Sequence, residues 1–256
     1  MLSIILLAIL LSGSGCGEKA STSRLKVAVD ATLVPMAFIN DEKKLDGFEV
    51  ELIRAVAKEA GWDIDLVNVE WAGLFGGLIT RKYDLAISSV TILEERKERM
   101  AFSIPYLKSG VALVVRKDME GVESLEDIKA KNLTVGAQLG TTAYFLLEKD
   151  PAIQVKGYQQ YGHAVADMVN GEIDAALGES TATLYYKNQN NEIFQKIKMV
   201  VQIMTEEFYG IVLRKEDKKL LEQVNAALST LLKNGTVSKL HDKWDLGQAA
   251  SVPEIQ

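Results

Sequence analysis

The chain has 256 residues, of which 48% are hydrophobic and 25% are charged, with a formal net charge of −6 at pH 7. These values are ordinary for a globular protein and fit either one large domain or two smaller ones. The acidic balance and the lack of a basic stripe argue against nucleic acid as a partner. A single cysteine excludes an internal disulfide, so stability must come from packing.

The N-terminal segment differs in kind from the rest of the chain. Residues 2–11 are nearly all apolar, which suits the core of a signal peptide and is too short to span a bilayer. Small residues at 12–15 lead to Cys16, an order that resembles a bacterial lipoprotein signal in which Cys16 carries the lipid. Gly13 stands where such signals usually have Leu, and no Lys or Arg precedes the apolar run. We therefore predict a signal segment at 1–16, a polar tether at 17–23 and a lipid anchor as the sole membrane attachment, the alternative being a buried or free thiol.

Strands and helices alternate along the next part of the chain. The expected strands are 26–30, 64–69 and 85–87, the expected helices are 48–60 and 74–79, and a loop is expected at 31–38. Gly61 is expected to end the first helix. Alternation of this kind predicts a mainly parallel sheet flanked by helices.

A second series of the same kind follows. Its expected strands are 111–116, 133–137, 153–155 and 175–177, and its expected helices are 142–149 and 163–170. Residues 82–87 (K-Y-D-L-A-I) and 172–177 (E-I-D-A-A-L) share the pattern x-x-D-x-A-aliphatic, which predicts two lobes of like design. After a strand at 208–213, an amphipathic helix at 220–232 ends at Asn234-Gly235, and its apolar stripe is interpreted as core.

Polar side chains follow the expected strand at 85–87. Ser88, Ser89 and Thr91 come directly after it, and Arg96 lies five residues further on. Ligands of α/β proteins bind where the strands of a sheet end. Small hydroxyls leave backbone N–H groups approachable, and the planar Arg fork matches a carboxylate in two parallel hydrogen bonds. The stretch predicts a carboxylate clamp; the alternative is a strand end with a solvated Arg.

Other strand ends supply complementary groups. Asp30 is an acceptor, Glu179 can accept from an ammonium group, and Trp71 offers a flat face for an aliphatic or cationic side chain. Thr141 and Thr142 stand at the start of a helix, where free N–H groups favour a carboxylate. A free α-amino acid needs this set of groups. The alternatives are a turn-forming Asp30, a core Trp71 and an ordinary helix cap at Thr141 and Thr142.

Motifs for metal or cofactor chemistry are not found. The sequence has no Cys/His metal set, no Walker loop, no G-x-G-x-x-G and no G-x-S-x-G elbow. His163 and His241 sit on expected helices, where a solvated or capping role is the simplest interpretation. We predict no metal, no cofactor and no nucleic-acid partner.

Several segments, in this order and spacing, resemble a known protein family. They are 45–52 (L-D-G-F-E-V-E-L, similar to L-x-G-F-D-V-D-L), 88–96 followed by 101–106, 139–142, 174–179, and 233–236 with Trp244 beyond. The family is that of the amino-acid-binding proteins of bacterial ABC importers, the family 3 extracellular solute-binding proteins. The resemblance covers roughly residues 24–247.

The resemblance implies a two-lobed α/β fold, the type II periplasmic-binding-protein fold, whose lobes close on a ligand like a hinged clamp. Each lobe would be a mainly parallel sheet flanked by helices. Two hinge crossover strands would lie near 106–110 and 205–209. Lobe 1 would comprise 24–108 plus 208–256, and lobe 2 would comprise 109–207.

The resemblance also implies a function. The chain would be the substrate-binding component of an ABC importer, a monomer in the periplasm or on the outer face of the cell membrane. It would capture a free amino acid and deliver it to a membrane permease without catalysing a reaction. In the implied site, Arg96 binds the α-carboxylate with the help of Thr91 and the Thr142 backbone. Ser89 and Glu179 bind the α-ammonium. The side-chain pocket is lined by Asp30, Leu33 and Trp71, and Gln138 reaches it. Glu179 stands where Asp is usual, and Leu33 where an aromatic residue is common.

A charge count favours one class of ligand. Arg96 and Glu179 match the two charges of an α-amino acid, which leaves Asp30 unpaired, and an uncompensated buried carboxylate is costly. A basic amino acid or glutamine is therefore expected, and glutamate or aspartate is not. The alternative function is a periplasmic cyclohexadienyl or prephenate dehydratase-like enzyme on the same fold, with Glu179 as a general acid shielded from water.

Overall fold

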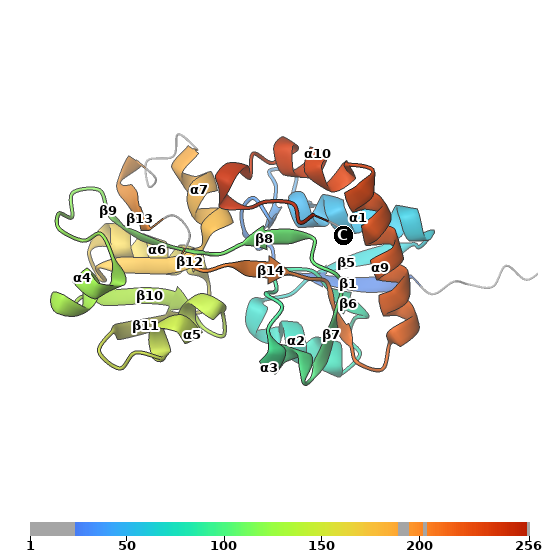
Figure 1. The fold of residues 1–256 in the computed structure, drawn as a ribbon, viewed down its shortest axis with the longest axis horizontal. Coiled ribbons are helices and arrows are strands. Elements are labelled where there is room, and N and C mark those ends of the chain that lie inside the picture. Colours follow the sequence, from blue (N-terminus) through green and yellow to red (C-terminus); the bar gives the residue numbers. More distant parts are fainter. Residues whose placement is uncertain (1–23, 189–194, 202–203, 255–256) are drawn as a thin grey trace, which may run out of the picture.

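Two sheets organise the chain, whose structure is a computed structural model that describes residues 24–188, 195–201 and 204–254 (Figure 1). The predicted signal segment, Cys16 and the tether lie outside the described residues. One sheet has the strand order β5-β1-β6-β15-β7, and the other has the order β11-β10-β12-β9-β13. We call the first sheet with its helices lobe 1 and the second with its helices lobe 2; Figure 1 shows them side by side.

The strands of both sheets are short. Lobe 1 contains β1 (Leu25–Val29), β5 (Ile64–Asn68), β6 (Leu85–Ala86), β7 (Met100–Phe102) and β15 (Val212–Arg214). Lobe 2 contains β9 (Val111–Arg116), β10 (Thr134–Gln138), β11 (Gln154–Tyr158), β12 (Ala175–Glu179) and β13 (Ile197–Val201). Within the described residues, the strands of each sheet run in one direction except β15 in lobe 1 and β9 in lobe 2.

Helices flank both sheets. Lobe 1 carries α1 (Phe48–Ala60), α2 (Trp71–Ile79), α3 (Glu94–Lys97), α9 (Lys218–Lys233), α10 (Thr236–Lys243) and the 3-10 turn η1 (Gly247–Ala249). Lobe 2 carries α4 (Leu125–Ala130), α5 (Thr142–Glu148), α6 (Tyr161–Asn170) and α7 (Ser180–Asn188). Among the helices of the described residues, none has the length and apolar character that crossing a bilayer would require.

Local sequence explains the longest helices. In α1 the apolar side chains recur at helical spacing, and Leu52 and Val56 are fully buried. Gly61 follows with a φ of 71°, a left-handed conformation that glycine adopts at no steric cost, so the predicted helix end is confirmed. The stripe on α9 buries Val224 and Leu228 against α1, which returns the end of the chain to lobe 1 (Figure 1).

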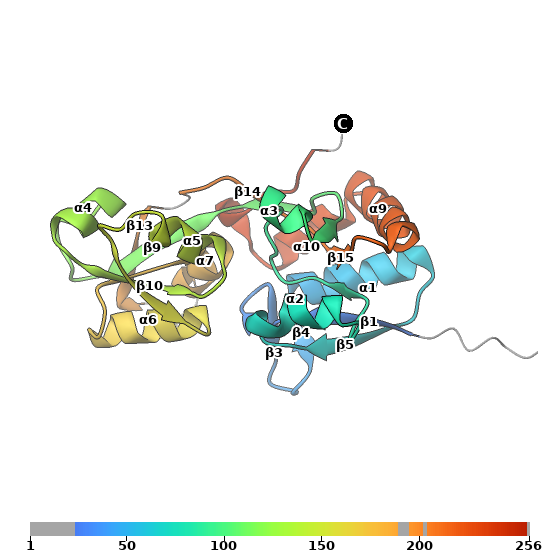
Figure 2. The same ribbon diagram turned by 90° about the horizontal axis from the view of Figure 1, so that it is seen from below.

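A two-stranded ribbon joins the lobes. It consists of β8 (Leu107–Ser109) and β14 (Glu207–Tyr209), which pair antiparallel with Glu207 opposite Ser109. Figure 2 shows β14 along one side of the molecule, between the lobes. The crossovers predicted near 106–110 and 205–209 contain these two strands. The proposed lobe boundaries, after 108 and after 207, therefore fall inside the ribbon.

The repeated x-x-D-x-A pattern has the same structural role in both lobes. Asp84 accepts a hydrogen bond from the Lys26 amide at 2.9 Å, and Asp174 accepts one from the Thr134 amide at 2.8 Å. The Asp84 amide in turn donates to Lys26 O, and the Asp174 amide donates to Thr134 O. Each aspartate thus satisfies a backbone donor at the start of the neighbouring strand and fixes that strand against its partner.

One predicted loop contains regular structure. In the region expected as a loop at 31–38, and just beyond it, lie β2 (Thr32–Leu33), β3 (Ala37–Ile39) and β4 (Leu45–Asp46), which form a small sheet. Strands of two or three residues are too short to generate a readable alternation of apolar and polar positions. The prediction of a loop was therefore wrong at these positions.

Candidate functional site

The predicted site residues gather where the two lobes face each other. Arg96 of lobe 1 donates from Nη2 to Gly140 O of lobe 2 at 3.1 Å. Trp71 lies so close to Gly140 that a Cβ on that glycine would stand 3.3 Å from its Nε1. Leu33 packs against the core residues of both lobes. The strand ends of lobe 1 therefore meet the start of α5 directly.

Arg96 is a half-buried cation at this junction. Its Nη1 donates to Thr91 O at 3.0 Å, and its guanidinium lies 5.5 Å from the centroid of the Trp71 ring and 5.4 Å from that of Phe75. Burial lowers the pKa of Arg96, while the charges of nearby carboxylates act in the opposite direction. Within the described part of the chain, no carboxylate oxygen lies within 4.0 Å of a guanidinium nitrogen of Arg96. The guanidinium is therefore held by carbonyls and aromatic faces rather than by an ion pair.

Asp30 is buried beside Trp71. Its Oδ2 accepts a hydrogen bond from the Trp71 amide at 2.9 Å, and its own amide donates to Ser88 Oγ at 3.1 Å. Oδ1 is buried and makes no hydrogen bond to the residues described. Burial raises the pKa of Asp30, although the nearby Thr32 hydroxyl acts to lower it. This carboxylate has an acceptor oxygen to offer to a donor.

Glu49 binds Ser89, a residue predicted to contact the α-ammonium of the ligand. The Ser89 amide and hydroxyl donate to Glu49 Oε1 at 2.6 and 3.2 Å, and the Tyr106 hydroxyl donates to the same oxygen. Ser89 has a φ of 47°, in the left-handed region that residues other than glycine rarely adopt. Glu49 is only 1% exposed, and burial raises its pKa to about 7 despite the three hydrogen bonds.

Glu179 lies at the end of β12 and faces the hinge. The Tyr209 hydroxyl donates to Glu179 Oε2. Burial, followed by the charge of Glu207, raises the pKa of Glu179 well above its ordinary value, while the Tyr209 hydrogen bond and the charge of Arg96 lower it. The carboxyl group of Glu179 on lobe 2 and the guanidinium cation of Arg96 on lobe 1 thus interact electrostatically across the junction.

Glu207 connects the two lobes through hydroxyl groups. Its Oε2 accepts from Thr91 Oγ1 of lobe 1 at 2.6 Å and from Thr142 Oγ1 of lobe 2 at 2.9 Å. Its Oε1 accepts from Thr205 Oγ1 at 2.8 Å. Glu207 is 5% exposed. Thr91 and Thr142 were both predicted to help bind a ligand, Thr142 through its backbone. Their hydroxyls converge on one buried carboxylate of the hinge strand β14.

Two predicted residues make their hydrogen bonds within lobe 2. Gln138 Nε2 donates to Gln159 O at 2.8 Å. Thr141 Oγ1 donates to Gln138 O at 2.7 Å and accepts from the Tyr144 amide at 3.3 Å as the N-cap of α5. Thr141 therefore has the capping role that the sequence left open as its alternative.

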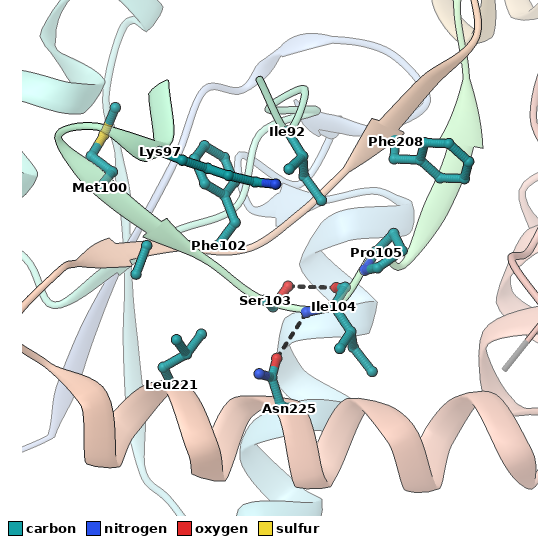
Figure 3. Close-up of a pocket in the computed structure, with 11 residues that line it drawn as sticks. Ile92, Lys97, Met100, Phe102, Ser103, Ile104, Pro105, Phe208, Leu221 and Asn225 are labelled. Carbon is teal, nitrogen blue, oxygen red and sulfur yellow. Dashed lines mark hydrogen bonds between the residues drawn. The ribbon is translucent and has the colours of Figure 1, made fainter. Parts of the chain in front are cut away.

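A cavity of about 680 Å³ lies on lobe 1, apart from these residues (Figure 3). Its lining comes from α3, β7, α9 and β14 and is largely apolar, with Lys97 as its charged side chain. Figure 3 shows two hydrogen bonds at this cavity. Ser103 Oγ donates to Ile104 O at 2.7 Å, and the Ile104 amide donates to Asn225 Oδ1 at 2.8 Å. None of the predicted ligand-binding residues lines this cavity, so the junction between the lobes remains the candidate site.

Comparison with known proteins adds the family. Residues 25–248 match the model of the bacterial extracellular solute-binding proteins, family 3. The chain belongs to this family. The L-cystine-binding protein TcyJ of Escherichia coli K12 is 33% identical over 222 residues, which cover 86% of this chain and 82% of that protein.

Solved structures of similar proteins share the fold. The structure of an ancestral arginine-binding protein bound to glutamine has a TM-score of 0.82 and 35% identity, covering 88% of this chain and 98% of that one. An ancestral amino acid-binding protein described as a precursor of cyclohexadienyl dehydratase has a TM-score of 0.79 and 32% identity, covering 86% and 95%. The predicted family and the two-lobed type II periplasmic-binding-protein fold are confirmed.

Sequence reasoning missed several junction residues of this solute-binding protein. Glu49, Tyr106, Tyr209 and Glu207 are buried there and were not among the predicted site residues. A signal for the last two existed in the period of two along a strand, because Glu207 and Tyr209 share one face of β14 and Phe208 takes the other. A glutamate among the apolar positions of α1 was a comparable signal for Glu49.

Glu49 makes the stability of the protein depend on pH. Its pKa rises from an ordinary 4.5 to about 7 on folding, so the folded state holds a proton that the unfolded state releases between these values. The contribution of Glu49 to stability is therefore complete below pH 4.5, is lost as pH rises through 7, and amounts to about 3 kcal/mol. We expect Glu49→Gln to remove this share of the pH dependence, measured as urea-unfolding free energies at pH 5 and pH 8.5.

The exposed Glu59 on the same helix provides the control. Glu59→Gln should lose as much stability as the wild type between the two pH values, because other titrating groups are unchanged. Equal losses in the wild type and in Glu49→Gln would show that Glu49 does not hold its proton in the folded state.

Proposed function

We propose that the chain is the substrate-binding component of an ABC importer and captures a free polar amino acid between its lobes. The observation that carries the proposal is Arg96, a cation at the junction without an ion pair among the described residues, across from the acid Glu179. A zwitterion offers the complementary pair of charges. The names of relatives support the ligand class, since they bind cystine, arginine or glutamine.

The groups of the junction divide among the parts of an amino acid. Arg96 has guanidinium N–H groups that can bind the α-carboxylate in a bidentate manner, with backbone amides of Thr91 and Thr142 beside it. Glu179 accepts from the α-ammonium. Asp30, with an unused oxygen, and the Trp71 ring next to it accommodate the side chain.

The unused Asp30 oxygen favours a ligand whose side chain donates hydrogen bonds or carries positive charge. A buried carboxylate without such a partner is costly, and a second carboxylate near it costs more. We therefore expect arginine, lysine or glutamine to bind more tightly than glutamate. Calorimetric titration of the mature chain, unfolded and refolded to remove bound ligand, measures this order. Equal affinities for arginine and glutamate would contradict the assignment of Asp30.

Arg96 is expected to be indispensable for binding. Arg96→Ala removes the cation that faces the ligand carboxylate, and we expect it to weaken binding at least about 100-fold, the cost of leaving a desolvated charge unpaired. Arg99→Ala, which removes an exposed arginine three residues away, should bind as the wild type does. Retained binding in Arg96→Ala, measured by the same titration, would exclude Arg96 as the carboxylate clamp.

We further propose that the mature protein is a monomer that delivers its ligand to a membrane permease. It lies in the periplasm or on the outer face of the cell membrane, where lipid on Cys16 anchors it. In a bacterial host supplied with labelled fatty acid, the full-length protein should fractionate with membranes and carry the label, whereas Cys16→Ser should carry none. Ser21→Ala, in the tether, should behave as the wild type. Absence of fatty-acid label on the wild-type protein would rule out the lipid anchor.

A dehydratase on the same fold remains the second candidate function. The observation that favours it is the raised pKa of buried Glu179, which keeps a proton available for a leaving group. The similarity to an ancestral precursor of cyclohexadienyl dehydratase is consistent with it, but that ancestor is itself described as an amino acid-binding protein. Prephenate turnover that disappears in Glu179→Gln would establish this alternative; absence of turnover would leave the binding function.

A further inference from the structure

The C-terminal segment 247–251 of lobe 1 lies against the hinge ribbon. The Lys108 amide of β8 donates to Ser251 O, and the Ser251 amide donates to Lys108 O, both at 2.8 Å. On its other side Lys108 stands opposite Phe208 of β14. Because a strand can pair along both of its edges, the two-stranded ribbon gains a third, antiparallel partner at this point.

The same segment is also bonded to lobe 2. Ala249 O accepts hydrogen bonds from Ser109 Oγ of β8 at 3.0 Å and from Ser180 Oγ at 2.8 Å, which use both of its lone pairs. Ser180 is the first residue of α7 in lobe 2, and α7 contacts η1 there (Figure 1). Ser109, Ser180 and Ala249 are all buried, so water does not compete for these hydrogen bonds.

Lobe 1 holds the opposite side of the segment. His241 of α10 donates from Nε2 to Ala250 O at 2.9 Å, and the side chains of Leu246 and Ala250 belong to the apolar core of lobe 1. Residues 247–251 are therefore fixed to lobe 1, whereas Ser180 belongs to lobe 2. A movement of one lobe relative to the other separates Ser180 from Ala249 O.

We propose that residues 247–251 form a strap, a third and non-covalent hinge connection that stabilises the arrangement of the lobes in which Arg96 reaches Gly140. The inference goes beyond the proposed function, because it concerns the free-energy difference between lobe arrangements and involves no group that contacts the ligand. An interaction that favours this arrangement strengthens the binding of every ligand held between the lobes. Loss of the strap therefore weakens all such ligands by one common factor.

Two variants release the strap at different points. Ser180→Ala removes the hydroxyl that binds Ala249 O, and Ser251→Pro removes the amide that donates to Lys108 O. Ala250, with a φ of −149° and a ψ of 163°, already has the extended conformation that suits a residue before proline. Ser251→Ala keeps the amide and is the matched control. We expect each releasing variant to weaken arginine and glutamine equally, about 3- to 10-fold, in calorimetric titration of the refolded mature chain, and the control to bind as the wild type does.

The arrangement of the lobes is measured separately, without ligand. Spin labels on cysteines that replace the exposed residues Glu59 of lobe 1 and Lys149 of lobe 2, in a mature chain without Cys16, report the distance between the lobes by double electron–electron resonance. We expect a shifted or broader distance distribution in Ser180→Ala and Ser251→Pro than in the wild type and in Ser251→Ala. Thermal unfolding checks that each variant is folded, and Ser251→Pro, at an exposed residue, decides the question if Ser180→Ala is not.

The remaining outcomes overturn the inference in distinguishable ways. Distances or affinities that stay as in the wild type would mean that residues 247–251 only pack against the hinge. Weakening of arginine without weakening of glutamine would place the effect in the ligand pocket, and tighter binding of both would mean that the segment favours separated lobes. A wild-type chain that binds no amino acid would end the proposed function alone, because the distances between the lobes test the strap without a ligand.

Discussion

The junction of the two lobes depends on charged groups that are buried without ion pairs among the described residues. Carbonyls hold Arg96, hydroxyls hold Glu207, and the Trp71 amide holds Asp30. Neutral dipoles of this kind satisfy the geometry of hydrogen bonding, while the opposite charges of Arg96 and of the carboxylates Glu179 and Glu207 offset one another only at distances longer than an ion pair. A zwitterionic ligand supplies the missing charges from within the junction. The buried charges that lower the stability of the ligand-free protein are therefore the ones that favour binding of the ligand.

The sequence predicts where several candidate site residues stand because the strands before them can be recognised. Apolar runs identify the strands, and the candidate residues Asp30 and Glu179 stand at the ends of β1 and β12. The repeated aspartates at 84 and 174 are another success, since one local pattern performs one local task in each lobe. These predictions needed only chain direction and the period of a strand. No choice between alternative partners was involved.

Partner choice is what the sequence could not supply. The amide and hydroxyl of Ser89, for example, bind Glu49, which lies 40 residues earlier in the chain on α1, and nothing in the sequence indicated this contact. A hydroxyl accepts or donates with nearly equal ease, so its role is set by whichever buried charge lies nearest in space. Glu206 and Glu207 are the same amino acid, yet Glu206 is exposed and Glu207 is buried. The alternation along β14 distinguishes them only once that segment is known to be a strand.

Glu207 on the hinge strand β14 contacts both lobes at once. Glu207 and Tyr209 share the buried face of β14, and they contact Thr142 and Glu179 of lobe 2. Because both contacts come from one short strand, a rotation of β14 moves both side chains at once. The contacts that β14 makes with Thr142 and Glu179 of lobe 2 would therefore form or break together when the lobes move.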